Sequence, residues 1–264
     1  MKKILFVNQD ITPYVEETEL SLMGINVPQK IQESGCDIRT FMPLWGNINE
    51  RRGQLHEVIR LSGLNISIND TDHPLIIKVA SIPQTKMQVY FIDNDEFFSR
   101  KGQTTDADGK PYGDNGERAV FFARGVVETL KKLHWTPDVI VCQGWMTALL
   151  PLYVKRAYSN EPAVSNAKIV TSIFNQGPEQ TLENTLKSSL SSSGIMEEYL
   201  NDYNDVMDGM DLAKIAVNHS DGIIAAQADS NANILSYAKK LGKAVLDFPG
   251  EDFTDSYNEF FNTL

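Results

Sequence analysis

The chain has 264 residues, 42% of them hydrophobic and 22% charged, which predicts one large globular domain or two small ones. Its 24 basic and 35 acidic residues give a net charge of −11, which argues against nucleic acid or an anionic membrane as a partner. With only Cys36 and Cys142, and no apolar run long enough to cross a bilayer, a reduced cytoplasmic setting is expected.

The first part of the chain alternates between strand and helix patterns. Residues 4–7 have the pattern of a buried strand, residues 20–33 that of a helix, and residues 37–42 that of a second strand closed by Pro43. This is a β-α-β unit, the building block of a parallel sheet. Three candidate strands without intervening helices, expected to form hairpins or a meander, follow at residues 55–61, 75–81 and 87–92.

A long polar loop at residues 99–118 precedes the rest of the chain, and such a loop is usually functional or disordered. Asp114 or Asn115 is expected to cap the helix that follows it, to about Lys132. The later elements are expected in this order: strand 139–142, helix 146–157, strand 169–173, broken helices within 178–210, helix 211–219, strand 222–226 and helix 230–241. The aromatic tail, residues 248–264, is predicted to be a helix that docks on the domain's own surface.

The alternation predicts a single Rossmann-like α/β domain over residues 1–264, with a mostly parallel sheet and helices on both faces. Ligands of open α/β sheets bind outside the carboxyl ends of the strands. We therefore expect strands 4–7 and 139–142 to lie in one parallel sheet and to end at the same crevice. The polar corner Gln143-Gly144-Trp145 would face that crevice.

Four separated segments resemble the glycogen and starch synthase family. Residues 135–151 match W-x-P-D-(apolar)-H-D-W-x-T-A-L-x-P, with Gln143-Gly144 in place of the family's His-Asp pair. Residues 3–14, 36–43 and 106–118 match K-(apolar)-L-F-V-x-x-E-x-x-P-F, G-H-D-V-R-V-x-x-P and D-x-x-G-x-x-Y-x-D-N-x-x-R. The similarity runs through nearly the whole chain and covers the family's N-terminal half, the starch synthase catalytic domain.

The resemblance implies one half of a GT-B glycosyltransferase and glucosyl transfer from ADP-glucose to an α-1,4-glucan. In the family, the second domain binds most of the sugar-nucleotide donor, and a K-x-G-G-L loop after the first strand contributes further contacts to that donor. Alignment places Glu16 at the lysine of that loop and Thr18-Glu19 at its glycines. Carboxylates there would repel a phosphate, although they equally suit the first turn of a helix. We therefore expect ADP-glucose to bind poorly, and the isolated chain to be inactive or dependent on a partner.

The resemblance also implies residues that contact a sugar. Gln143 can hydrogen-bond a hydroxyl but cannot perform acid–base chemistry near neutral pH, and it equally fits a capping turn without a ligand. Asn175 matches the asparagine of the family's T-x-H-N segment, in which Phe174 replaces the histidine. No catalytic residue is assigned. The predicted sugar contacts are Glu16, Gln143, Trp145, Thr147, Asn175 and Gln176.

No metal site and no cofactor are predicted, since the four histidines are isolated and residues 106–109 lack the further ligands of a calcium loop. An α-glucan or malto-oligosaccharide is the expected ligand. Two rival interpretations remain open: a non-catalytic glucan-binding or regulatory module, and half of a split synthase completed by a separate C-terminal-domain chain.

The crevice is expected to be covered, either by segment 178–210 together with the tail or by a second copy of the chain in a homodimer. The alternative is that Trp145 is buried within its own domain and the crevice is merely polar.

Overall fold

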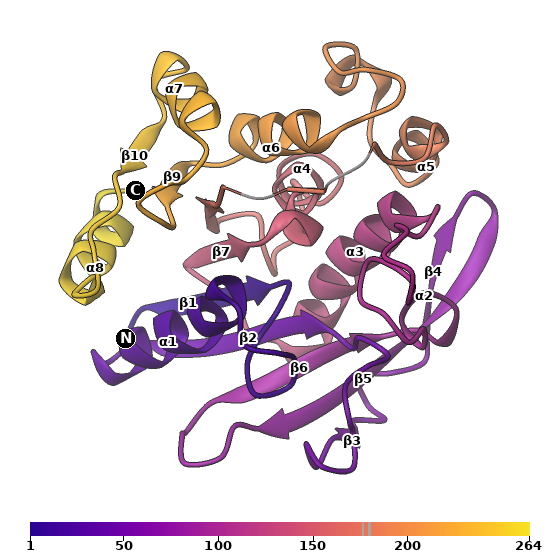
Figure 1. Cartoon of the computed structure of the whole chain (residues 1–264), viewed down its shortest axis with the longest axis horizontal. Coiled ribbons are helices and arrows are strands. Elements are labelled where there is room, and N and C mark those ends of the chain that lie inside the picture. The colour runs from indigo at the N-terminus through magenta and orange to yellow at the C-terminus, as the bar shows by residue number, and fades with distance from the viewer. Residues whose placement is uncertain (176, 179–180) are drawn as a thin grey trace.

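A single sheet runs through the molecule in the computed structural model, which describes residues 1–175, 177–178 and 181–264 (Figure 1). The strand order is β10-β9-β8-β7-β1-β2-β6-β5-β3, and β4 pairs with β5 alone. Its strands are β1 (Lys3–Asn8), β2 (Asp37–Pro43), β3 (His56–Glu57), β4 (Leu64–Ile68), β5 (Thr71–Ser81), β6 (Gln88–Asp93), β7 (Val139–Gln143), β8 (Lys168–Ile173), β9 (Gly222–Ala225) and β10 (Ala244–Leu246). From β10 to β6 every pairing is parallel, whereas β5 is antiparallel to its neighbours.

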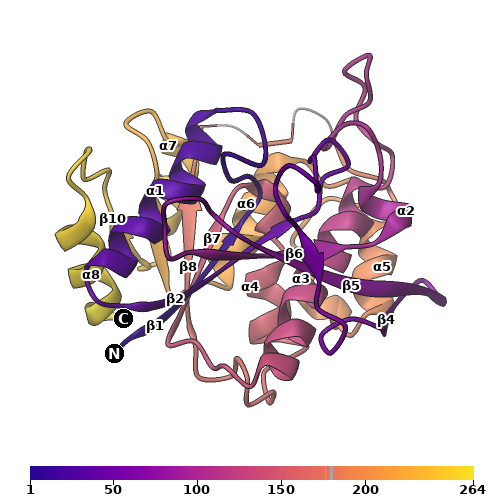
Figure 2. The same ribbon diagram turned by 90° about the horizontal axis from the view of Figure 1, so that it is seen from below.

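Helices cover both faces of this sheet (Figure 2). The helices are α1 (Glu19–Glu33), α2 (Asp95–Phe98), α3 (Asn115–Leu133), α4 (Leu150–Lys155), α5 (Leu186–Ser192), α6 (Gly209–Asn218), α7 (Ala232–Lys240) and α8 (Thr254–Thr263), with short 3-10 turns η1 (Trp145–Thr147) and η2 (Glu197–Tyr199). The chain steps from β1 to β2 in one direction, and from β6 through β7 to β10 in the other. Because parallel crossovers are right-handed, α1 lies on one face and α3, α4, α6 and α7 lie on the other. The predicted fold class, Rossmann-like with a mostly parallel sheet, is confirmed.

The reversal of strand order falls between β1 and β7, in the middle of the sheet. These two strands pair directly, with Asn8 opposite Gln143, so the prediction that both lie in one parallel sheet is confirmed. Their carboxyl ends therefore open at one place, which is the switch point where open α/β sheets bind ligands.

Local details depart from the sequence predictions for identifiable reasons. The predicted helix 146–157 is divided into η1 and α4, because Pro151 fits only the first turn of a helix, where its missing N–H leaves no bond unmade. The predicted strand 55–61 keeps only the two residues of β3. The hairpin β4–β5 was not predicted; its turn residues Asn69 and Asp70 both have positive φ, which these residue types tolerate.

The C-terminal helix α8 packs beside α1 (Figure 2). Tyr257, Phe260 and Phe261 are buried, and the ring of Phe260 lies so close to Gly222 that a Cβ there would come within 2.8 Å of it. The Lys2 ammonium group donates a hydrogen bond of 2.5 Å to the carbonyl of Phe261. None of the helices in the described ranges combines the length and the apolar character needed to cross a membrane.

Candidate functional site

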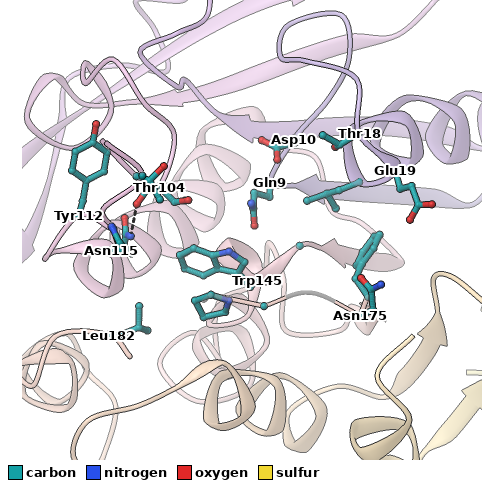
Figure 3. A pocket seen from close by; sticks show the side chains of 18 of the residues that line it. Gln9, Asp10, Thr18, Glu19, Thr104, Tyr112, Asn115, Trp145, Asn175 and Leu182 are labelled. Carbon is teal, nitrogen blue, oxygen red and sulfur yellow. Dashed lines mark hydrogen bonds between the residues drawn. The ribbon is translucent and has the colours of Figure 1, made fainter. Parts of the chain in front are cut away.

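A cavity of about 610 Å³ opens at the carboxyl ends of the central strands (Figure 3). The cavity is lined by the segments that follow β1, β7, β8 and β9, by the N-terminus of α1 and by the loop between α2 and α3. Segment 178–210 contributes Pro178, Thr181 and Leu182, whereas no residue of the tail 248–264 lines the cavity. The prediction that the tail covers this crevice is therefore wrong, because α8 is held against α1 instead.

One wall of the cavity is formed by Gln9 and Asp10, directly after β1. The Asp10 side chain is 7% exposed, and its Oδ1 accepts hydrogen bonds from Trp45 Nε1 at 2.9 Å and Gln103 Nε2 at 3.0 Å. Burial raises the pKa of Asp10 to about 6, although hydrogen bonds from Trp45 and Gln9 act in the opposite direction. The cavity therefore holds a carboxyl group that changes charge close to neutral pH.

The floor is the corner after β7, where Gly144 leads into Trp145. Gly144 has φ +90°, and a Cβ added there would lie 2.6 Å from the Cβ of Gln9, so only glycine fits. The Gln9 side chain crosses this corner and accepts a hydrogen bond from the backbone N–H of Met146 at 3.1 Å. The corner is thereby fixed, and the half-buried ring of Trp145 borders the cavity (Figure 3).

The opposite wall is the loop between α2 and α3, which contributes Thr104, Thr105 and Tyr112. Two interactions hold it: the Asn115 amide donates to the carbonyl of Thr104 at 2.8 Å, and the Arg100 guanidinium pairs with Asp114 at 2.6 Å. Asp114 occupies the predicted N-cap position of α3, but its carboxylate is used by Arg100 rather than by the helix. The length of this loop predicted that it is either functional or disordered. In the structure the loop forms one side of the cavity.

A buried cation supports that wall from behind. The Arg118 side chain is fully buried among the rings of Trp45, Phe98 and Tyr112, at 5.2 to 5.4 Å from its guanidinium carbon, and burial lowers its pKa to about 10. Its Nε donates to the carbonyl of Phe97 at 2.7 Å and its Nη1 to Asn115 Oδ1 at 2.7 Å. These contacts orient the wall without placing the cation in the cavity.

The charges that line the cavity are negative. Asp10 and Glu19 are its acidic members, and among the lining residues that the structure describes there is no lysine or arginine. Thr18 caps α1 through Ser21, so the residues at the family's glycine positions begin a helix. Gln227, after β9, donates a hydrogen bond to the Glu19 carboxylate and joins two sides of the rim. No group of three or more His, Cys, Asp or Glu in the described part of the chain is arranged to hold a metal ion.

The structure brings together some of the predicted sugar contacts. Trp145 and Asn175 line the cavity, and the Asn175 amide donates to Asp229 at 2.6 Å. Thr147 lies under the corner, where its hydroxyl donates to the carbonyl of Gly144 at 2.7 Å, and it lines a smaller adjoining pocket of about 80 Å³. Gln176 lies outside the described residues.

Gln143 and Glu16 are not among the residues that line the cavity. Strand β7 continues through Gln143 rather than ending at Cys142, and all five residues of this central strand are buried because helices cover both faces of the sheet. It is fully buried, and its amide atoms have no hydrogen-bond partner among the described residues. Glu16 is exposed before α1. The sequence analysis did not identify Gln9 and Asp10 as cavity residues. Their position directly after the first strand could have indicated this, because ligands bind at the carboxyl ends of parallel strands.

Comparison with known proteins identifies the family. Residues 3–245 match the model of the starch synthase catalytic domain. A glycogen synthase of Chlorobium limicola is 36% identical over 197 residues, which are 72% of this chain and 40% of that protein. A glycogen synthase of Chlorobaculum tepidum is 33% identical over 217 residues, 82% of this chain and 42% of that protein. The chain belongs to the starch synthase catalytic domain family.

A solved structure supports the fold. The catalytic domain of starch synthase IV from Arabidopsis thaliana, bound to ADP and acarbose, superposes with a TM-score of 0.73 at 19% identity. The match covers 97% of this chain and 53% of that one, so the predicted equivalence to half of a GT-B enzyme is confirmed at the level of the fold. The chain spans about 40% of the length of the glycogen synthases that it matches.

The buried Asp10 predicts an unusual dependence of stability on pH. Its pKa is raised from 3.8 to about 6, so the folded protein binds this proton more tightly than the unfolded chain does. The folded state therefore loses stability as pH rises from about 4 to about 6, by on the order of 3 kcal/mol. Asp10→Asn keeps an oxygen acceptor for Trp45 and removes the charge. We expect it to increase the free energy of unfolding at pH 7.5 by up to ~3 kcal/mol and to change little at pH 4.

Urea unfolding at the two pH values measures this difference. Asp108→Asn, which neutralises an exposed carboxylate on the α2–α3 loop, serves as control and should change the free energy by less than about 0.5 kcal/mol at both. A less stable Asp10→Asn protein at pH 7.5 would show that the charged form of Asp10 supports the fold.

Gln143→Met tests whether the buried amide has a role in the cavity. A buried polar group without a partner costs about 1 to 3 kcal/mol, and methionine has a similar volume without that cost. We expect thermal unfolding at the wild-type temperature or above, and unchanged affinity for malto-oligosaccharide. If Gln143→Met is as stable as wild type but binds malto-oligosaccharide more weakly, Gln143 contributes to the binding site.

Proposed function

We propose that this chain is the acceptor-side half of a glycogen or starch synthase-like protein, and that its cavity binds an α-1,4-glucan. The observation that carries the proposal is the lining of the cavity. Aromatic surface from Trp145, Tyr112 and Phe174 lies beside hydroxyl and amide groups, and the described lining residues carry two carboxylates and no cation. Neutral sugars offer apolar ring faces and hydroxyl donors, and this lining is complementary to both.

The same lining disfavours the phosphates of a sugar nucleotide. A developing phosphate charge is stabilised by lysine, arginine or the N-terminus of a helix. The N-terminus of α1 does reach the cavity, but Glu19 sits in its first turn. We therefore assign the glucan to this half, and the recognition of ADP-glucose to residues beyond these 264, on the same polypeptide or on a partner chain.

Glucosyl transfer from ADP-glucose to the glucan is the proposed activity of the complete assembly. The related starch synthase IV domain is bound to ADP and acarbose, which supports a nucleotide and a sugar as the ligands of such an assembly. A non-catalytic glucan-binding or regulatory module is the second candidate. The observation that favours it is Glu19 at the rim of the cavity, at a position where the family has glycine. The formation of a homodimer and the binding of a separate chain that carries the C-terminal domain are further predictions.

Calorimetry with two ligands tests the proposal. We expect maltoheptaose to bind the 264-residue chain, and ADP-glucose to show no saturable binding up to about 1 mM, corresponding to less than about 4 kcal/mol of binding free energy. Trp145→Ala should weaken maltoheptaose binding about tenfold, because an aromatic ring at the centre of a contact carries much of its energy. Phe248→Ala removes an aromatic side chain that is exposed and outside the cavity lining, and should leave the affinity unchanged.

Tight binding of ADP-glucose without any binding of maltoheptaose would contradict the proposal. Binding of maltoheptaose that survives Trp145→Ala unchanged would place the glucan elsewhere on the molecule.

A further inference from the structure

The buried carboxyl group of Asp10 lowers the stability of the fold when it is ionised. An ionised carboxylate that is almost fully buried loses its hydration, and it is normally compensated by a cation. Here the described residues that line the cavity include no lysine or arginine, and the guanidinium of Arg118 is directed to Phe97 and Asn115 instead. Nothing in the packing of the domain therefore requires a charge at this position.

The carboxyl group is nevertheless held in one orientation. Trp45, itself fully buried, donates from Nε1 both to Asp10 Oδ1 and to the carbonyl of Gln9, each at 2.9 Å. Gln103, from the α2–α3 loop, donates to the same Oδ1 at 3.0 Å. Trp45 and Gln103 both donate to Oδ1, and Asp10 lines the cavity, so its carboxylate keeps acceptor capacity for a ligand there.

A fixed carboxylate oxygen in such a cavity is suited to hydroxyl donors. Hydrogen bonds to a charged acceptor are stronger than those between neutral groups, and adjacent hydroxyls of a sugar ring supply two of them. A phosphate at neutral pH offers little donor capacity and is repelled by the same charge. The geometry points to Asp10 as the residue that makes the cavity selective for a neutral, hydroxyl-bearing sugar, through hydrogen bonds accepted by its carboxylate. This assignment rests on the proposed glucan-binding function.

The assignment implies that glucan affinity depends on pH. Hydroxyl donors stabilise the charged form of Asp10, so affinity falls as the carboxyl takes up its proton near pH 6. Glu19 of α1 and Tyr112 are the other ionisable groups among the described lining residues. Behind the lining lie the Arg100–Asp114 pair, Arg118 of α3, and Glu183, which accepts from the first N–H groups of α3 and whose pKa is raised by burial. No histidine is among the described lining residues.

Calorimetric titration of the whole chain with maltoheptaose at pH 8 and pH 5 tests the role of Asp10. The wild-type dissociation constant should rise about tenfold at pH 5, as expected one pH unit below the midpoint. Asp10→Asn should bind at least tenfold more weakly than wild type at pH 8, with less than a twofold difference between the two pH values. Asp108→Asn should keep both the wild-type affinity and the wild-type pH profile. Thermal unfolding of each protein at both pH values confirms that it is folded.

The three possible results separate the two ideas. If wild type loses affinity at pH 5 and Asp10→Asn is weak and insensitive to pH, the assignment holds. If wild type binds maltoheptaose and Asp10→Asn binds equally well with the same pH profile, the role of Asp10 is refuted while the glucan-binding function stands. If wild type binds no maltoheptaose at either pH, both are refuted.

Discussion

The site depends on the close contact between the ends of β1 and β7. The two strands pair in register up to Asn8 and Gln143, and the next N–H, that of Gln9, donates to the carbonyl of Gln143 at 2.9 Å. This leaves no room for a side chain at Gly144, where the chain must turn with a positive φ. Asp10 and Trp145 are thereby fixed on two sides of one cavity. A ligand site at the switch point follows from this constraint, because the strands diverge only beyond it.

The two carboxylates that line the cavity have different relations to the stability of the fold. A buried carboxylate without a cation weakens the folded state near neutral pH, and positions that cost stability in this way are often retained for binding. The carboxylates at the start of α1 have a different origin, since negative charge is favoured in the first turn of a helix. Glu19 combines both roles, because it begins α1 and also borders the cavity.

The sequence predicted the layers of the fold well and the site only in part. Alternating strands and helices were sufficient to predict a parallel sheet that contains both β1 and β7, because this order of elements builds parallel β-α-β units. The burial of Gln143 was not predictable from its polar character, because Gln143 is the last residue of β7, a central strand whose five residues are all buried. The environment of Asp10 was also out of reach. It depends on Trp45 and Gln103, which are distant in sequence and meet only when the α2–α3 loop has folded.

The central claim is that this half of the synthase-like protein recognises a neutral glucan through the Asp10–Trp145 cavity. A crystal structure of the chain grown with malto-oligosaccharide and ADP-glucose together tests it most directly. We expect a glucan in the cavity, with a sugar ring against Trp145 and a hydroxyl within hydrogen-bonding distance of the Asp10 carboxylate, and no phosphate beside Glu19. A diphosphate bound at the N-terminus of α1, with the glucan absent from the cavity, would contradict it.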